Sequence, residues 1–127
     1  MKTGKNTMRT LLSSVMFLYL IMSCEPPPDP YENKFKIYTV NIHNVSIPGP
    51  EIVLMTDENM IARDTVNYEG FAAFSEDIQE IDREIKVEIT DIDGYENNGK
   101  FQTMTYKLTK DQKEYTYMLI EEPEENQ

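Results

Sequence analysis

The stretch IKVEIT at residues 85–90 is the clearest indication of the fold in this chain. Its isoleucines and valine alternate with lysine, glutamate and threonine, so an extended segment would have one apolar face and one polar face. A period of two is typical of a β-strand that is buried on one side and exposed to water on the other. The stretch therefore predicts a half-buried strand at the surface of a sheet.

Six other segments share this signature, which is alternation or a short run of β-branched and aromatic residues between turn residues. They lie at residues 34–42, 52–55, 61–66, 71–74, 101–108 and 115–120. The run IVLM at 52–55 is apolar on both faces, so we expect it at the centre of a sheet. Residues 75–83 are predicted to form a loop with at most one or two helical turns, capped by Ser75.

About seven short strands with frequent turn signals are typical of a β-sandwich. No βαβ spacing is present, so a parallel sheet is not expected. The predicted fold class is all-β, with one sandwich domain over residues 34–121 and one modest core. The chain has eight tyrosines, and those on strands are expected as half-buried rims of the core more often than as interface contacts.

The first residues carry a different signature. Three basic residues, Lys2, Lys5 and Arg9, precede a mainly apolar run at 11–22. The run is shorter than the roughly 20 apolar residues that a transmembrane helix needs, and it fits the h-region of a signal peptide. The sequence therefore predicts a signal peptide over residues 1–23.

Residues 21–24, IMSC, resemble a bacterial lipobox. The resemblance implies cleavage between Ser23 and Cys24 by signal peptidase II and a new N-terminus that carries acyl chains on Cys24, the only cysteine. Two or three acyl chains anchor firmly, because each buried methylene contributes about 0.8 kcal/mol. The first expected partner is therefore a lipid bilayer in a bacterial cell envelope. The outer membrane is the expected destination, with its periplasmic and surface faces both left open.

Residues 24–33, CEPPPDPYEN, read as a proline-rich tether, and residues 122–127 as an acidic tail. Four prolines favour polyproline II, which advances about 3.1 Å per residue. Cleavage would remove three of the 12 basic residues and none of the 23 acidic ones, leaving a mature charge of −14. Nucleic-acid phosphates and anionic lipids would repel such a chain, so nucleic-acid binding is excluded.

Two neighbouring stretches resemble the carboxypeptidase regulatory-like pattern. They are SIPGPEIVL at 46–54 and DTVNYEGFAAF at 64–74, in which a glycine turn leads into each strand. Both glycines, Gly49 and Gly70, would adopt positive φ. The resemblance implies a seven-stranded sandwich of prealbumin-like or immunoglobulin-like kind. Asn67 departs from the pattern, which has Asp at that position.

A third stretch, VEITDIDGYENNGKF at 87–101, is similar, together with the lipobox, to a family of lipoproteins encoded beside radical SAM enzymes. Within it, Asp91, Asp93, Glu96 and Asn97 offer the oxygen ligands that calcium prefers. The EF-hand spacing fails, because Tyr95 stands at the third ligand position. An irregular calcium site stays open beside the preferred interpretation, a plain turn, and no metal or other cofactor is expected.

No catalytic residue is assigned. His43 is the only histidine, so a two-histidine metal site or a Cys–His pair cannot be built. No nucleophile-elbow sequence is present either. The sequence predicts a non-enzymatic module that binds a protein or glycan partner, or helps to assemble an envelope complex. The alternative is an export substrate or accessory of a neighbouring radical SAM enzyme, modified on side chains other than cysteine.

Overall fold

The computed structural model describes residues 25–93 and 99–123. The expected signal peptide, Ser23 and Cys24, the calcium candidates Glu96 and Asn97, and residues 124–127 lie outside this part of the chain. The chain divides into two compact units, Met1–Pro30 and Tyr31–Gln127. Of the first unit only residues 25–30 are described, and they are exposed and form neither helix nor strand.

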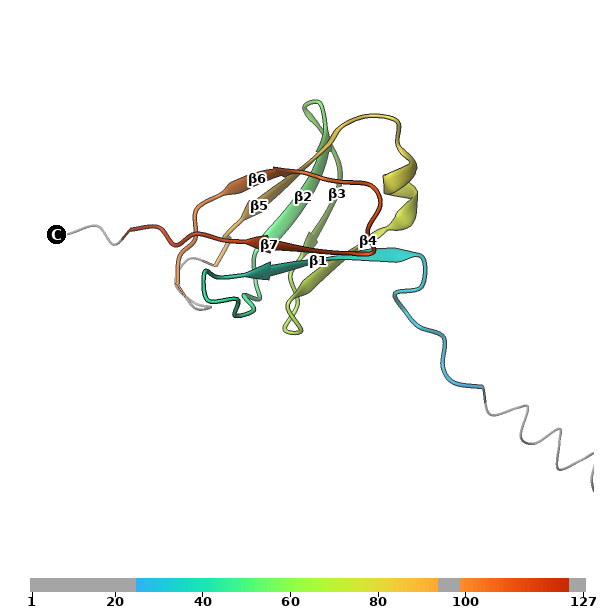
Figure 1. Ribbon diagram of the computed structural model, residues 1–127, viewed down its shortest axis with the longest axis horizontal. Helices are drawn as coiled ribbons and strands as arrows, with labels where there is room; N and C mark the ends of the chain where they lie inside the picture. Colours follow the sequence, from blue (N-terminus) through green and yellow to red (C-terminus); the bar gives the residue numbers. More distant parts are fainter. Residues whose placement is uncertain (1–24, 94–98, 124–127) are drawn as a thin grey trace, which may run out of the picture. The chain divides into compact units, whose positions relative to one another are not determined.

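The described part of the second unit is an all-β sandwich of seven strands, which confirms the predicted fold class (Figure 1). One sheet has the order β4-β1-β7 and the other the order β3-β2-β5-β6. The strands are β1 (Lys34–Val40), β2 (Glu51–Thr56), β3 (Asn59–Thr65), β4 (Phe71–Ser75), β5 (Ile85–Thr90), β6 (Met104–Lys107) and β7 (Glu114–Met118).

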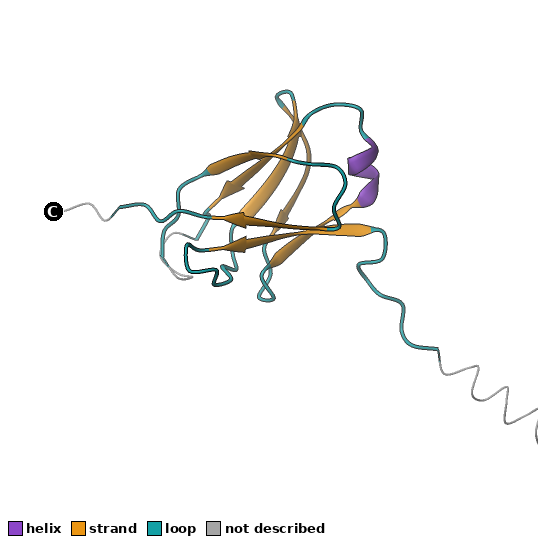
Figure 2. Cartoon of the chain, viewed as in Figure 1, coloured by secondary structure: helices purple, strands orange, loops and turns teal. Residues whose placement is uncertain are grey.

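A short 3-10 helix, η1 (Glu76–Glu80), follows β4 (Figure 2). The Oγ of Ser75 accepts a hydrogen bond from the Asp77 N–H, and Glu76 and Asp77 stand in the first turn. This short helix, capped by Ser75, agrees with the predicted loop of at most one or two helical turns within residues 75–83.

The core lies between the two sheets and is built by alternate residues of each strand. On β5, Ile85, Val87 and Ile89 are fully buried, as predicted. β2 lies between β3 and β5, which confirms its central place, and its outward side chains are half-buried. Full burial of each such aliphatic side chain contributes roughly 1.5–3 kcal/mol, so this alternation supplies most of the drive to pack the sheets.

Thr39 is a buried polar residue in this core. Its Oγ1 donates to the Ile47 carbonyl at 2.7 Å, and the Ile47 N–H donates to the Thr39 carbonyl at 2.9 Å. A buried hydroxyl is tolerated only when it is hydrogen-bonded. The paired bonds therefore hold the segment after β1 against β1 itself.

The pairing of β1 with β7 differs from expectation, because these strands run parallel. Lys36 pairs with Glu114 and Val40 with Met118, whereas β1 pairs with β4 in the antiparallel sense. The βαβ pattern detects only parallel neighbours that a single crossover joins. It could not reveal this pair, because five strands lie between β1 and β7 in the sequence. The partition also differs from that of constant-type immunoglobulin domains, in which the first two strands share a sheet.

Three strands are shorter than predicted. β1 ends at Val40 because Asn41 starts a turn, β6 begins only at Met104, and β7 ends at Met118. Phe101, expected at the start of that strand, pairs instead with Glu121 in an isolated bridge. Residues 100–102 and 120–122 thus form a small ladder of their own at one end of the sandwich.

The compact unit begins at Tyr31, before the first strand. The Tyr31 ring packs edge-on against Phe71 with centroids 5.1 Å apart. The Lys36 Nζ lies 4.8 Å from the Tyr31 ring centroid and 4.6 Å from that of Phe71, within the range of cation–π attraction. These contacts cover Phe71 on the outer face of its sheet.

Candidate binding surface

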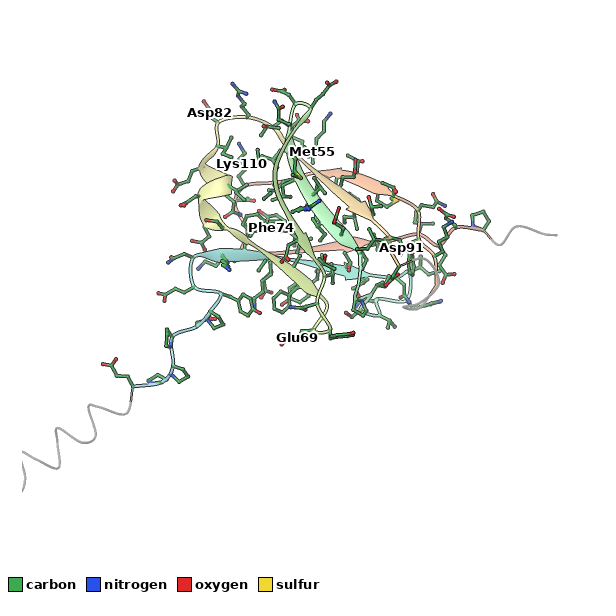
Figure 3. The ribbon with its side chains drawn as sticks, turned by 180° about the vertical axis from the view of Figure 1, so that it is seen from behind. Met55, Glu69, Phe74, Asp82, Asp91 and Lys110 are labelled. Carbon is green, nitrogen blue, oxygen red and sulfur yellow. The ribbon has the colours of Figure 1, made fainter. Side chains whose placement is uncertain are left out.

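The loops at the end of the sandwich where β1 ends form the candidate surface. This loop end comprises residues 41–50, 66–70, 91–93 with 99–103, and 119–123, and it lies away from η1 (Figure 1). Seen from behind, Glu69 and Asp91 lie toward the loop end, whereas Asp82 and Lys110 lie toward the other (Figure 3).

Exposed apolar side chains gather at the loop end. Of the seven exposed large hydrophobic residues in the described part of the chain, six lie in these loops or at their edge, and the seventh, Met60, lies on β3. The six are Ile42, Val45, Tyr68, Ile92, Met118 and Ile120. Scattered exposed apolar residues are ordinary, but their concentration at one end of a domain is typical of an interaction site.

Asn41 builds the first of two turns that present three of these side chains, Ile42, Val45 and Tyr68. Its Oδ1 accepts hydrogen bonds from the His43 N–H at 2.9 Å and the Val45 N–H at 3.0 Å. Its own N–H donates to the Val45 carbonyl, and its carbonyl accepts from Asn44, which has φ of 62°. The fixed turn holds the Ile42 side chain outward, 64% exposed.

Asn67 builds the second turn with the same bonds at the same spacing. Its Oδ1 accepts from the Glu69 N–H at 3.0 Å and the Phe71 N–H at 3.2 Å. Its N–H donates to the Phe71 carbonyl, and its carbonyl accepts from Gly70, which has the expected positive φ, 95°. The residue after the asparagine, Tyr68, is again apolar and stands 94% exposed.

Hydrogen bonds join the segments that flank the two turns. The Thr39 N–H donates to the Gly70 carbonyl at 3.3 Å. The Gly49 N–H donates to the Val66 carbonyl at 2.9 Å, and the Val66 N–H donates to the Pro50 carbonyl at 2.8 Å. Gly49 also has the predicted positive φ, 105°. These bonds therefore hold the flanking segments of the two turns together.

A cleft of about 190 Å³ opens between the joined segments. Its lining comes from both of them: Pro48, Gly49, Thr65, Val66, Asn67 and Tyr68. Proline, valine and the tyrosine ring give it a mainly apolar wall. A cleft of this size holds one or two side chains of a partner, well below the volume of a usual small-molecule site.

Carboxylates flank this cleft. Asp64, just before Thr65, accepts a hydrogen bond from the Ala73 N–H through Oδ2 at 3.0 Å and from the Thr65 N–H through Oδ1 at 2.9 Å. Glu51 pairs in register with Thr65, and Glu69 follows Tyr68. These hydrogen bonds fix the position of the Asp64 carboxylate. One of them also gives a partner to the Ala73 N–H, which lies on the edge of β4 that no other strand pairs with.

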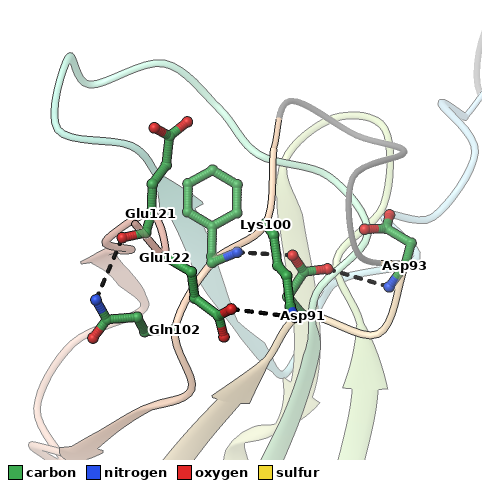
Figure 4. Close-up of polar contacts among 7 residues, drawn as sticks. Asp91, Asp93, Lys100, Gln102, Glu121 and Glu122 are labelled. Atoms are coloured by element: carbon green, nitrogen blue, oxygen red, sulfur yellow. Dashed lines mark hydrogen bonds and ion pairs between the residues drawn. The ribbon is translucent and has the colours of Figure 1, made fainter. Parts of the chain in front are cut away.

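The Asp91 loop adds a polar corner to the loop end (Figure 4). Asp91 Oδ1 accepts from the Asp93 N–H at 3.2 Å, and Oδ2 accepts from the Phe101 N–H at 2.9 Å. Burial, which outweighs these main-chain bonds, raises the pKa of Asp91 above its ordinary value. Beside it, the Lys100 Nζ lies 3.2 Å from a Glu122 carboxylate oxygen.

The predicted calcium ligands are therefore only half described. Asp91 and Asp93 lie together, and both oxygens of Asp91 already accept main-chain N–H groups, which is the behaviour of a turn residue. Within residues 25–93 and 99–123, no group of three or more His, Cys, Asp or Glu side chains is placed to hold a metal ion. Glu96 and Asn97 lie outside the described residues, so the calcium site itself stays a prediction.

Three tyrosines close the seam between β6 and β7. The Tyr106 and Tyr117 rings stack with centroids 4.5 Å apart, and Tyr115 lies 6.4 Å from Tyr117. The Tyr106 hydroxyl donates to the Met118 carbonyl at 2.6 Å. Burial, followed by the charges of the neighbouring phenols, raises the pKa of Tyr117 to about 12. Tyr106 and Tyr117 are half-buried at the rim of the core and Tyr115 is buried within it, whereas Tyr68 is exposed.

Comparison with known proteins brings no match: no family model, curated protein or solved structure is detectably similar to this chain. The described residues also include no helix long and apolar enough to cross a membrane.

Sequence reasoning predicted the turn at residues 67–70, but it missed the matching turn at residues 41–45 and the bonding pattern that the two turns share. A signal for them is present, because NIHNV at 41–45 and NYEGF at 67–71 share an asparagine, then an apolar residue, then Asn or Gly two positions later. Asn and Gly are the residues that most readily adopt positive φ. The cleft has no such local signal, since it depends on the contact between the two segments.

Proposed function

We propose that this chain is a non-enzymatic, lipid-anchored binding module of the bacterial cell envelope, which holds a protein partner at the loop end. The observation that carries the proposal is the concentration of exposed apolar side chains there, on turns fixed by hydrogen bonds. Exposed apolar surface on a rigid scaffold binds with little loss of conformational entropy. Loops on a sandwich are common places for such contacts.

The place of attachment supports this assignment. In the proposal, Cys24 carries the lipid, the exposed residues 25–30 act as a tether, and the chain enters the sandwich before Lys34. The loop end lies at the other end of the same strand. Seven residues at about 3.3 Å each separate the two ends by roughly 20 Å. Anchoring at one end therefore leaves the loop end accessible.

The chemistry of the surface favours a protein over a glycan. Ile42, Val45 and Ile120 are exposed aliphatic side chains, which offer a sugar neither hydrogen bonds nor a stacking face. A protein partner gains from covering them, at roughly 25 cal/mol per Å² of apolar surface. The mature charge of −14 also works against docking on an anionic membrane.

Site-specific photo-crosslinking in a bacterial host tests the binding surface. A photoreactive amino acid at position 42 or 68 should give one discrete protein adduct. The same group at Met60, exposed but on β3, is the matched control and should give none. Adducts of equal yield from all three positions would indicate random collision and would contradict the proposal.

Fractionation tests the anchor. The unchanged chain should enter the detergent phase as mature protein, because the acyl chains supply the anchoring energy, whereas Cys24→Ser should keep residues 1–23 and carry no acyl mass. Detergent-phase protein whose Cys24 carries no acyl mass would refute lipid attachment at this residue. Intact mass measurement of the anchored protein also separates the alternative: extra mass beyond acylated residues 24–127 would support modification by another enzyme.

A further inference from the structure

We propose that the loop end takes a protein segment in which Lys or Arg stands beside apolar side chains. Tyr68 at the cleft and Ile42 on the neighbouring turn act as its apolar anchors. This inference rests on the proposed function, because it names the chemical class of the partner that the module would hold. It is carried by the paired turns, the cleft between their segments and the charge around them.

The paired turns present their anchors without a large entropic cost. Asn41 and Asn67 each fix a turn through two bonds to Oδ1 and two main-chain bonds. The main chain of both turns is therefore already ordered before Ile42 and Tyr68 meet a partner. Fixing one side chain costs about 0.5–1.5 kcal/mol, so ordering these two anchors takes little from the free energy of binding.

The cleft gives the partner a place for an apolar side chain. It is bounded by Pro48 and Val66 and opens beside the exposed ring of Tyr68. Tyrosine and arginine are enriched among residues that dominate binding energy, and such residues cluster around small pockets of this kind. An apolar side chain in the cleft would bury the Tyr68 ring, which is otherwise almost wholly in water.

The charge around the cleft determines whether a positively or a negatively charged partner is attracted. Residues 41–51 and 64–70 carry three carboxylates, Glu51, Asp64 and Glu69, and neither lysine nor arginine. Arg63 precedes Asp64 on β3 and lies opposite Val53 of the neighbouring strand β2. His43 belongs to the first turn. A cationic segment would therefore be attracted, and an anionic one repelled by these residues and by the whole chain.

Phage display tests the inference. Random dodecapeptides are selected for binding to the full chain, which is held in nonionic detergent. Recovered peptides should be enriched in Lys or Arg with at least one aliphatic or aromatic residue. Their binding should fall roughly tenfold or more for the Ile42→Ser/Tyr68→Ser variant, as expected for the loss of central apolar anchors. This variant leaves the net charge unchanged, so non-specific attraction cannot mimic the effect.

Two controls make each outcome decisive. Met60→Ser removes an exposed apolar side chain elsewhere and should change binding less than twofold, within the range of a near-neutral contact. Glu51→Gln/Glu69→Gln should weaken binding more than the charge-matched Glu58→Gln/Glu80→Gln. Cationic peptides indifferent to Ile42→Ser/Tyr68→Ser would overturn the inference.

Different results would contradict this inference and the proposed function. Peptides without basic residues that still depend on Tyr68 would overturn the partner class alone. Failure of photo-crosslinking at positions 42 and 68 would remove the proposed function, whatever the peptides show.

Discussion

A Cβ atom placed on Gly70 would fall 2.1 Å from the Ser46 Oγ and 3.2 Å from the Ser46 Cβ. The turn before β4 is thus pressed against the segment that follows β1. Because Gly70 also has φ of 95°, two separate constraints require glycine at this position. The contact is where the two asparagine turns meet.

Gly70→Ala should lower the free energy of unfolding by about 2 kcal/mol, from the left-handed backbone and the crowded contact together. The Ser46 hydroxyl can rotate away, but its Cβ would still be too close. Urea unfolding followed by circular dichroism measures the loss. In a Ser46→Gly background the steric part should vanish, leaving about 1 kcal/mol of backbone strain. Equal losses in both backgrounds would show that the contact is not crowded.

Asn67→Ala should cost about 1–3 kcal/mol, because the Glu69 and Phe71 N–H groups lose their acceptor. Asn67→Asp keeps an oxygen in the same place and should lie within about 0.5 kcal/mol of the unchanged protein. Because Asn and Asp both place an oxygen at this position, the turn can accept asparagine where the carboxypeptidase regulatory-like pattern has aspartate. Urea unfolding of both variants measures the difference, and a large loss for Asn67→Asp would contradict this account.

Lys110→Met should lower stability by about 1 kcal/mol, because the Nζ donates to the carbonyls of Ile81 and Arg83 and holds the loop after η1. Lys107→Met is the matched control. Its ammonium lies 3.4 Å from Glu84 in an exposed pair, and such pairs contribute little. Thermal unfolding of the two variants should separate them, and equal effects would mean that both lysines act only through charge.

Alkaline pH should destabilise the fold through Tyr117. Its pKa is raised to about 12, above the ordinary value of 10.0, so the unfolded chain releases this proton first as pH rises. The contribution to the free energy of unfolding is complete below about pH 10 and declines between about pH 10 and about pH 12. Urea midpoints across this range should fall less for Tyr117→Phe than for the unchanged protein. Identical profiles would refute the assignment to Tyr117.

Calcium at millimolar concentration should leave the urea midpoint unchanged if residues 91–99 form a plain turn. Asp91→Ala should nevertheless cost about 1–3 kcal/mol, because the N–H groups of Asp93 and Phe101 lose their acceptors. A midpoint that rises with calcium, and no longer rises in Asp93→Asn, would establish the irregular calcium site instead.

Local patterns predicted what depends on neighbours in the sequence. The alternation at 85–90, the doubly apolar run at 52–55 and the cap at Ser75 each describe how a short segment meets water or core. The parallel pairing of β1 with β7 was not predictable in this way, because no local pattern records which distant edge a strand will join. The early end of β1 and late start of β6 have the same origin, since competing partners such as Glu121 come from elsewhere in the chain.

The candidate surface was less predictable than the fold. Residues 41–45 and 67–71 were predicted as the end of a strand and part of a turn, and their shared bonding emerges only when main-chain directions are known. Exposure of Ile42 and Tyr68 likewise depends on what the remainder of the domain covers. Cys24 and Ser23, the most specific sequence features, lie outside the described residues and stay predictions.

The parallel alignment of β1 and β7 sets an order of events. β1 is central in its sheet, and one of its two neighbours is contributed only when residues 114–118 become available. Closing a loop of this length is entropically costly and slow compared with forming a hairpin. A chain that emerges N-terminus first from a channel would therefore keep one edge of β1 unpaired until residues 114–118 have emerged. Until then it would remain a client for chaperones and proteases, which makes the C-terminal strand the step that commits the domain to folding.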